Sequence, residues 1–133
     1  MHVNHLDHVN IVTHDLPGTA RFYVDLFDLE ARNGPPPSRP DKVQWIYDGA
    51  GRAILHLNAV GALQVFERDA QPGPTTGAVH HVALNCEGFA DMEDRLKSRA
   101  LDYQVNDVSS IGLKQIFLTD PNGVLLELNF FQG

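Results

Sequence analysis

Two histidines, 73 residues apart, lie in matching stretches of the chain, and both could bind a metal ion. His8 is followed by Val-Asn-Ile and His81 by Val-Ala-Leu, so each precedes an apolar, a small or polar, and another apolar residue. The offset (81 − 8 = 73) is slightly more than half of the 133 residues. Matching stretches half a chain apart predict one structural unit that is used twice.

A second matching pair supports this repeat. The motif Leu-His-Leu around His56 matches the motif Leu-Glu-Leu around Glu127, if one residue is inserted between His56 and the turn before it. The spacing from His8 to His56 is 48 residues, and that from His81 to Glu127 is 46. We therefore expect equivalent strand positions for His56 and Glu127, and a pseudo-two-fold relation that brings all four side chains together.

These side chains suit one divalent metal ion. Imidazole nitrogens and a carboxylate oxygen are good ligands, and two histidines with one carboxylate leave positions open for a substrate. Alternation along the strands places the polar side chains on one face of a sheet and the neighbouring leucines and valines on the other. Asn10, Asn58 and Asn129 share the polar face, which predicts a wet pocket over a curved sheet.

Two similar sets of elements are expected to position these residues. A helix follows Asp15, a helix-capping residue, and buries Tyr23 and Phe27; a second helix covers about residues 88–100. Alternation and turn residues predict strands over 5–13, 43–48, 53–60, 79–85, 115–119 and 124–130, with shorter extended pieces near Leu29 and over 103–105. Each half is therefore βαβββ, which makes the fold α+β.

We expect the two halves to form a single domain over residues 1–133 with one mixed-sheet cup. Module one covers about 1–66 and module two about 79–133. Between them, a linker of about 67–78 contains Gln-Pro-Gly-Pro-Thr-Thr-Gly, a composition typical of a surface segment.

Composition excludes several classes of partner. The formal net charge of −7 argues against a nucleic-acid surface. No apolar run approaches the roughly 18 residues of a membrane span, and the first residues lack the pattern of a secretory signal. Cys86 is the single cysteine, which excludes an internal disulfide. We therefore expect a cytoplasmic protein that binds neither nucleic acid nor membrane.

These motifs resemble the vicinal oxygen chelate superfamily, which includes glyoxalase I, fosfomycin-resistance proteins, bleomycin-resistance proteins and extradiol dioxygenases. The resemblance covers nearly the whole chain and implies paired βαβββ modules around a metal. It is carried by Leu6-Asp7-His8-Val9, Asp15-Leu16-Pro17 with Arg21-Phe22-Tyr23, His80-His81-Val82-Ala83-Leu84, and Asp120-Pro121-Asn122-Gly123-Val124-Leu125-Leu126-Glu127-Leu128.

The resemblance implies that His8, His81 and Glu127 are metal ligands. His56 stands where glyoxalase I-like members use a fourth ligand, usually glutamate, so it is a candidate ligand, a candidate catalytic acid or base, or a residue that lines the pocket. Phe117 stands where extradiol enzymes usually have a tyrosine, which weakens the extradiol reading. Asn10, Asn58, Phe117 and Asn129 are the expected pocket residues.

The sequence leads to a metal-dependent enzyme that acts on a small substrate with adjacent oxygen atoms, and we favour a dioxygenase-like reaction. The alternatives are a glyoxalase I-like lyase or isomerase, a fosfomycin-resistance-like transferase, and a metal-free binding protein of the bleomycin-resistance kind. The expected cofactor is one divalent ion (Fe²⁺, Mn²⁺, Zn²⁺ or Ni²⁺). The expected assembly is a homodimer, with the cup formed within one chain or exchanged between two.

Overall fold

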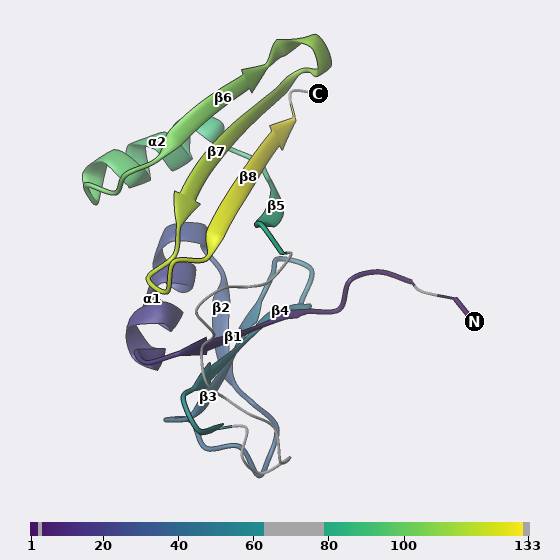
Figure 1. The fold of residues 1–133 in the computed structure, drawn as a ribbon, viewed down its shortest axis with the longest axis vertical. Coiled ribbons are helices and arrows are strands. Elements are labelled where there is room, and N and C mark those ends of the chain that lie inside the picture. The colour runs from purple at the N-terminus through teal and green to yellow at the C-terminus, as the bar shows by residue number, and fades with distance from the viewer. Residues whose placement is uncertain (3, 63–78, 132–133) are drawn as a thin grey trace. The chain divides into compact units, whose positions relative to one another are not determined.

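The computed structural model describes residues 1–2, 4–62 and 79–131 and divides the chain into two compact units, Met1–Pro74 and Thr75–Gly133. Each unit is one βαβββ module (Figure 1). The expected linker of about 67–78, and the end of module one at about 66, lie outside the described residues. The organisation of both modules as one domain stays a prediction.

Module one has a four-stranded mixed sheet. Its strand order is β1-β4-β3-β2, with β1 parallel to β4 and the other neighbours antiparallel. The elements are β1 (Val9–Thr13), α1 (Leu16–Phe27), β2 (Glu30–Asn33), β3 (Val43–Tyr47) and β4 (Ala53–Ala59).

Module two repeats this topology. Its strand order is β5-β8-β7-β6, again with the first and last strands parallel. The elements are β5 (Val82–Cys86), α2 (Phe89–Ser98), β6 (Gln104–Val108), the 3₁₀ turn η2 (Ser109–Ile111), β7 (Leu113–Thr119) and β8 (Leu125–Phe131). The predicted α+β class and the two βαβββ modules are confirmed, whereas η2 was not expected.

The prediction that His8 and His81 lie within strands is wrong in detail. The parallel ladders begin at Val9 opposite Leu55 and at Val82 opposite Leu126, so each histidine stands one residue ahead of its strand. Without a ladder partner, neither backbone meets the definition of a strand. The two histidines nevertheless hold the same place relative to β1 and β5.

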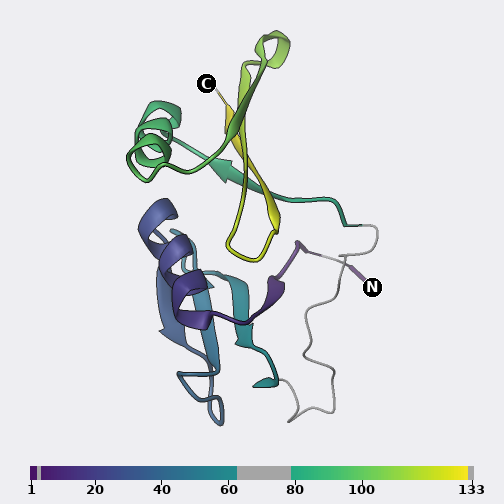
Figure 2. The same ribbon diagram turned by 60° about the vertical axis from the view of Figure 1, so that its left-hand side comes forward.

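Each helix covers the apolar face of its own sheet. In module one, Asp15 caps α1 by accepting a hydrogen bond from the Gly18 amide (3.0 Å), and Tyr23 and Leu26 are fully buried on the helix. Figure 2 shows α1 lying along the sheet. In module two, Phe89 of α2 packs edge-on against Phe130 of β8, with ring centroids 5.5 Å apart. The opposite face of each sheet is therefore left for polar side chains.

None of the helices in the described residues is long and apolar enough to cross a bilayer.

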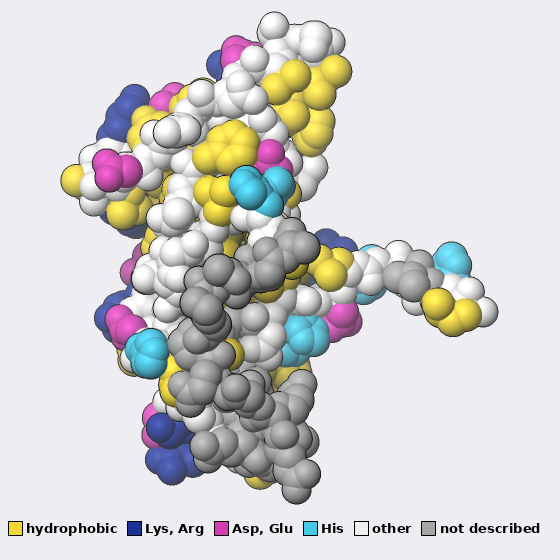
Figure 3. Space-filling model, viewed as in Figure 1, with side chains coloured by type: hydrophobic (Ala, Val, Ile, Leu, Met, Phe, Trp, Pro, Cys, Tyr) yellow, Lys and Arg dark blue, Asp and Glu magenta, His cyan; other side chains and the backbone are white. Residues whose placement is uncertain are grey.

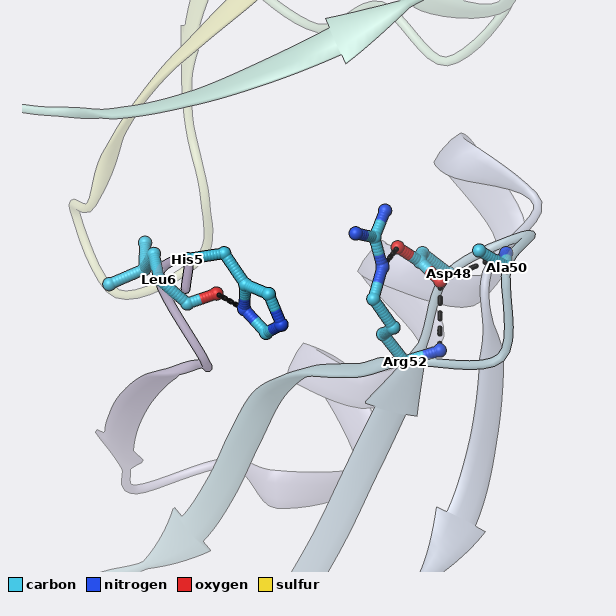
Figure 4. Close-up of polar contacts among 5 residues, drawn as sticks. All are labelled: His5, Leu6, Asp48, Ala50 and Arg52. Atoms are coloured by element: carbon cyan, nitrogen blue, oxygen red, sulfur yellow. Dashed lines mark hydrogen bonds and ion pairs between the residues drawn. The ribbon is translucent and has the colours of Figure 1, made fainter. Parts of the chain in front are cut away.

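A turn closed by one aspartate connects β3 to β4 (Figure 4). Asp48 Oδ1 accepts hydrogen bonds from the backbone amides of Ala50 (3.0 Å) and Arg52 (2.9 Å). The backbone of Asp48 also donates to the Arg52 carbonyl (2.9 Å), and Gly51 takes a positive φ of 78°. These bonds satisfy the backbone groups that the tight turn leaves outside the ladder.

The same turn occurs between β7 and β8. Asp120 Oδ1 accepts from the amides of Asn122 (2.8 Å) and Val124 (2.9 Å), and Gly123 has a φ of 79°. Asp120 also donates its backbone amide to the Val124 carbonyl (2.9 Å). The repeat therefore extends to individual hydrogen bonds.

A β-bulge accounts for the residue inserted in the first half. Between β3 and β4 the register runs from Ile46 opposite Leu55 to Tyr47 opposite Ala53, so Ile54 is an extra residue. The corresponding register between β7 and β8 continues without a shift. The bulge keeps His56 in register although the turn before it is displaced by one residue.

We expect Gly51→Ala and Gly123→Ala each to lower the free energy of unfolding by about 1 kcal/mol. An added Cβ meets no atom within 4 Å at either position, so the cost comes from the positive φ alone. Gly49→Ala is the matched control in the same turn, because its added Cβ is equally open and its φ lies outside the left-handed region. Urea unfolding measures all three, and an equal loss at Gly49 would contradict this explanation.

Candidate functional site

The polar face of module one carries His56 at its centre. The register places Asn10 of β1 and Trp45 of β3 directly opposite His56 on its two sides. Partners in register point to the same face, so the three side chains lie together. Asn58, two residues along β4, donates from Nδ2 to Asn10 Oδ1 (3.0 Å) and is only 3% exposed.

The His56 ring is stacked between two other rings. Its centroid lies 3.6 Å from that of His8, with an interplanar angle of 12°, and 3.9 Å from that of Trp45, with an angle of 5°. The stack therefore joins a residue ahead of β1 to residues of β4 and β3. Trp45 therefore belongs to this stack and lies on the polar face of the sheet.

Burial lowers the pKa of His56 from its usual 6.5 to about 4, and the nearby His8 adds to this effect. Asp7 acts in the opposite direction, because its negative charge favours imidazolium. At neutral pH the His56 ring is therefore uncharged and keeps a lone pair on one nitrogen. A neutral imidazole can accept a proton or bind a metal.

His8 is oriented by its neighbour in the chain. The Asp7 Oδ2 atom lies 2.7 Å from His8 Nδ1, and this hydrogen bond lowers the pKa of Asp7. Because the carboxylate accepts a hydrogen bond from Nδ1–H, the free lone pair of the neutral His8 ring lies on Nε2. This is the carboxylate–histidine arrangement that commonly orients metal-binding imidazoles.

The stacked geometry opposes joint metal binding by His8 and His56. A histidine nitrogen directs its lone pair within the ring plane, so a bound ion lies close to that plane. Two nearly parallel planes do not meet at one ion. If both residues were ligands of the same metal, one ring would have to turn out of the stack.

Module two brings His81 and Glu127 together. His81 Nε2 lies 3.3 Å from Glu127 Oε2, and the two side chains are 37% and 14% exposed. The Nδ1 atom of His81 is hydrogen-bonded to Nδ1 of His80 (2.9 Å). Histidine side chains are accessible at the surface in Figure 3. With 37% of its side chain exposed, His81 can be reached from solvent.

A chain of amides supports Glu127 from the other side. Gln115 Nε2 donates to Glu127 Oε1 (2.7 Å) and to Asn129 Oδ1 (3.0 Å), and Asn106 Nδ2 donates to Gln115 Oε1 (2.8 Å). Phe117 lies directly opposite Glu127 in the ladder. Gln115 and Asn106 were not among the predicted site residues. The sequence could have pointed to Gln115, because it lies two residues before Phe117 and therefore on the same face of the strand.

Within module one the structure brings His8 to His56, and within module two it brings His81 to Glu127. In residues 1–2, 4–62 and 79–131, no cluster of three or more His, Cys, Asp or Glu side chains is placed to hold a metal ion. Convergence of all four residues stays a prediction.

His81 and Glu127 fit a divalent metal by their chemistry and spacing. Two atoms that are each about 2.1 Å from one Zn²⁺ lie at most about 4.2 Å apart. The 3.3 Å separation of Nε2 and Oε2 allows both to bind one ion. Nε2 of His81 faces the carboxylate, and it carries the lone pair in the tautomer whose Nδ1–H donates to His80 Nδ1. By atom type and separation, the His81–Glu127 pair is therefore compatible with two ligands of one divalent ion.

The fold agrees with comparisons to known proteins. A sequence profile of the Glyoxalase/Bleomycin resistance protein/Dioxygenase superfamily matches residues 5–128. The chain therefore belongs to this superfamily, whose members usually bind a divalent metal. No match was found among curated proteins.

Solved structures show the same fold at low sequence identity. A glyoxalase/dioxygenase from Nostoc punctiforme is 15% identical with a TM-score of 0.76, over 97% of this chain and 92% of that one. A glyoxalase/bleomycin resistance protein/dioxygenase from Nocardioides is 18% identical with a TM-score of 0.70, over 98% and 85%. Lactoylglutathione lyase from Agrobacterium tumefaciens is 19% identical with a TM-score of 0.63, over 92% and 91%.

We expect His56 to make folding pH-dependent between about pH 6.5 and pH 4. In this window the unfolded chain binds a proton at His56 and the folded chain does not, so stability falls as the pH falls. His56→Phe keeps an aromatic ring in the stack without a titrating group. Urea unfolding at pH 8 and pH 4.5, followed by emission of the single tryptophan, Trp45, should show a smaller loss for the variant. Equal losses in both proteins would contradict the prediction.

Proposed function

We propose that this protein is a metal-dependent enzyme acting on a small substrate with adjacent oxygen atoms. The observation that carries the proposal is the 3.3 Å approach of His81 Nε2 to Glu127 Oε2, at positions equivalent to His8 and His56 of module one. Membership of the superfamily supports the same reading.

In this proposal His81 and Glu127 hold the metal, and His8 contributes a third ligand through Nε2. Asp7 keeps the proton of His8 on Nδ1, so that Nε2 is available. The metal would act as a Lewis acid toward the substrate oxygens; with Fe²⁺ the reaction class is dioxygenation, and with Zn²⁺, Ni²⁺ or Mn²⁺ it is isomerisation, elimination or group transfer. We favour the dioxygenase-like class, because several imidazoles suit a redox metal better than magnesium or calcium.

His56 is proposed as a proton acceptor rather than a fourth ligand. Its low pKa keeps the ring neutral at pH 7, and its stacking between His8 and Trp45 holds the ring in one orientation. An imidazole nitrogen of His56 would take a proton from the bound substrate. Asn10, Asn58, Phe117 and Asn129 remain the proposed pocket residues, and a homodimer in the cytoplasm stays a prediction.

One observation favours a metal-free binding protein as the second candidate. The rings of His8, His56 and Trp45 contact one another face to face, so both histidines are already held by aromatic neighbours without a metal. In that case Glu127→Gln would leave ligand binding nearly unchanged. The lyase and transferase alternatives remain open within the first candidate, and one structure with this fold is a lactoylglutathione lyase.

Metal content tests the proposal directly. We expect about one metal ion per chain in protein purified without chelator or affinity tag, because the ligand set defines one site. His81→Ala and Glu127→Ala should each reduce this to a small fraction, while His14→Ala, at an exposed position after the end of β1, should not. Elemental mass spectrometry provides the measurement and identifies the ion. Wild-type protein that contains no metal and takes up none of the four candidate ions would refute the enzyme proposal.

A further inference from the structure

The two carboxylate oxygens of Glu127 have different partners. Oε2 faces His81 Nε2 at 3.3 Å, whereas Oε1 accepts a hydrogen bond of 2.7 Å from Gln115 Nε2. One oxygen is therefore directed at the candidate metal ligand, and the other is held by a neutral donor. A carboxylate restrained at one oxygen cannot rotate freely about its terminal bond.

Strand register explains why a glutamine makes this contact. Gln115 lies directly opposite Asn106 on β6 and Asn129 on β8, while Glu127 is the diagonal neighbour, two residues before Asn129. Diagonal neighbours are about 7–8 Å apart, a distance that a long side chain can bridge. The side chain of Gln115 has this reach, and a side chain one methylene shorter would not.

The hydrogen bonds also determine the orientation of the Gln115 amide. An ionised carboxylate only accepts hydrogen bonds, so the NH₂ end of Gln115 must face Glu127. The same NH₂ group donates to Asn129 Oδ1 (3.0 Å), and the carbonyl oxygen accepts from Asn106 Nδ2 (2.8 Å). Both ends of the amide are therefore occupied, and flipping it would lose all three bonds.

The equivalent position in module one lacks such a donor. Val43 lies opposite Asn58 and two residues before Trp45, just as Gln115 lies opposite Asn129 and two residues before Phe117. Module one presents His56, a neutral ring held by stacking, where module two presents a carboxylate. The amide donor thus occurs in module two, beside the carboxylate of Glu127, and not in module one, beside the imidazole of His56.

We propose that Gln115 is a positioning residue that holds Glu127 Oε1 and so directs Oε2 toward His81 and a metal ion bound there. This inference rests on the metal site proposed above and adds a residue that acts through Glu127. Outer-shell groups of this kind commonly change metal affinity by 10- to 100-fold.

The test measures the dissociation constants of Mn²⁺ and Zn²⁺ for the full chain. Free Mn²⁺ is detected by its electron paramagnetic resonance signal, and Zn²⁺ binding is measured by competition with a chromophoric chelator. We expect Gln115→Met, which keeps the length but cannot donate, to weaken binding by about 10- to 100-fold. Gln115→Asn keeps the amide but not the reach, and we expect a similar loss.

Gln44→Met is the matched control. Gln44 Nε2 also donates two hydrogen bonds, to Asn33 Oδ1 (3.1 Å) and to the Pro40 carbonyl (2.9 Å), but these lie in module one and do not involve Glu127. The same substitution therefore removes two hydrogen bonds donated by Nε2, as in Gln115→Met, without affecting the carboxylate. We expect metal affinity within about twofold of wild type.

A double variant separates positioning from a general structural effect. If Gln115 acts through Glu127, adding Gln115→Met to Glu127→Gln should cause no further loss of affinity. Unchanged metal affinity in Gln115→Met, or an additive loss of affinity in the double variant, would overturn the inference about Gln115. In either case, metal binding by the wild-type chain would still support the metal site. A wild-type chain that binds neither ion would overturn both.

Discussion

The parallel pairing of the first and last strands in each module determines where every candidate side chain lies. A parallel pair needs a long crossover, and here the crossover is the rest of the module: a helix and two antiparallel strands. The register places Asn10 beside His56 and Ala83 beside Glu127. A shift of one residue would turn both polar side chains toward the apolar core.

The two modules stabilise their central polar residue in different ways. In module one, His56 is a neutral ring between His8 and Trp45, and burial keeps it uncharged by lowering its pKa. In module two, Glu127 is only partly exposed. Its Oε1 atom accepts a hydrogen bond from Gln115, and its Oε2 atom faces His81. An imidazole can be buried by contact with other rings, whereas a carboxylate requires donors. Equivalent strand positions therefore carry chemically different polar residues in the two modules.

In the function proposed above, this difference would give His56 and Glu127 distinct roles. A carboxylate and an imidazole at 3.3 Å are suited to holding a cation, and a neutral stacked imidazole is suited to accepting a proton. Membership of the Glyoxalase/Bleomycin resistance protein/Dioxygenase superfamily is consistent with such a division but does not select the reaction. Under the proposed function, the reaction class would depend on which metal is bound and on the substrate.

The sequence alone determined the repeat, the α+β class, and the equivalence of His56 with Glu127, because these follow from local alternation and from matching motifs. It placed His8 and His81 within strands, although both stand one residue ahead, because ladder ends depend on the partner strand. Only the tertiary structure decided that His56 stacks on Trp45 and that Gln115 reaches Glu127. These contacts join different strands, and which side chains meet depends on register and on side-chain length, which no local pattern encodes.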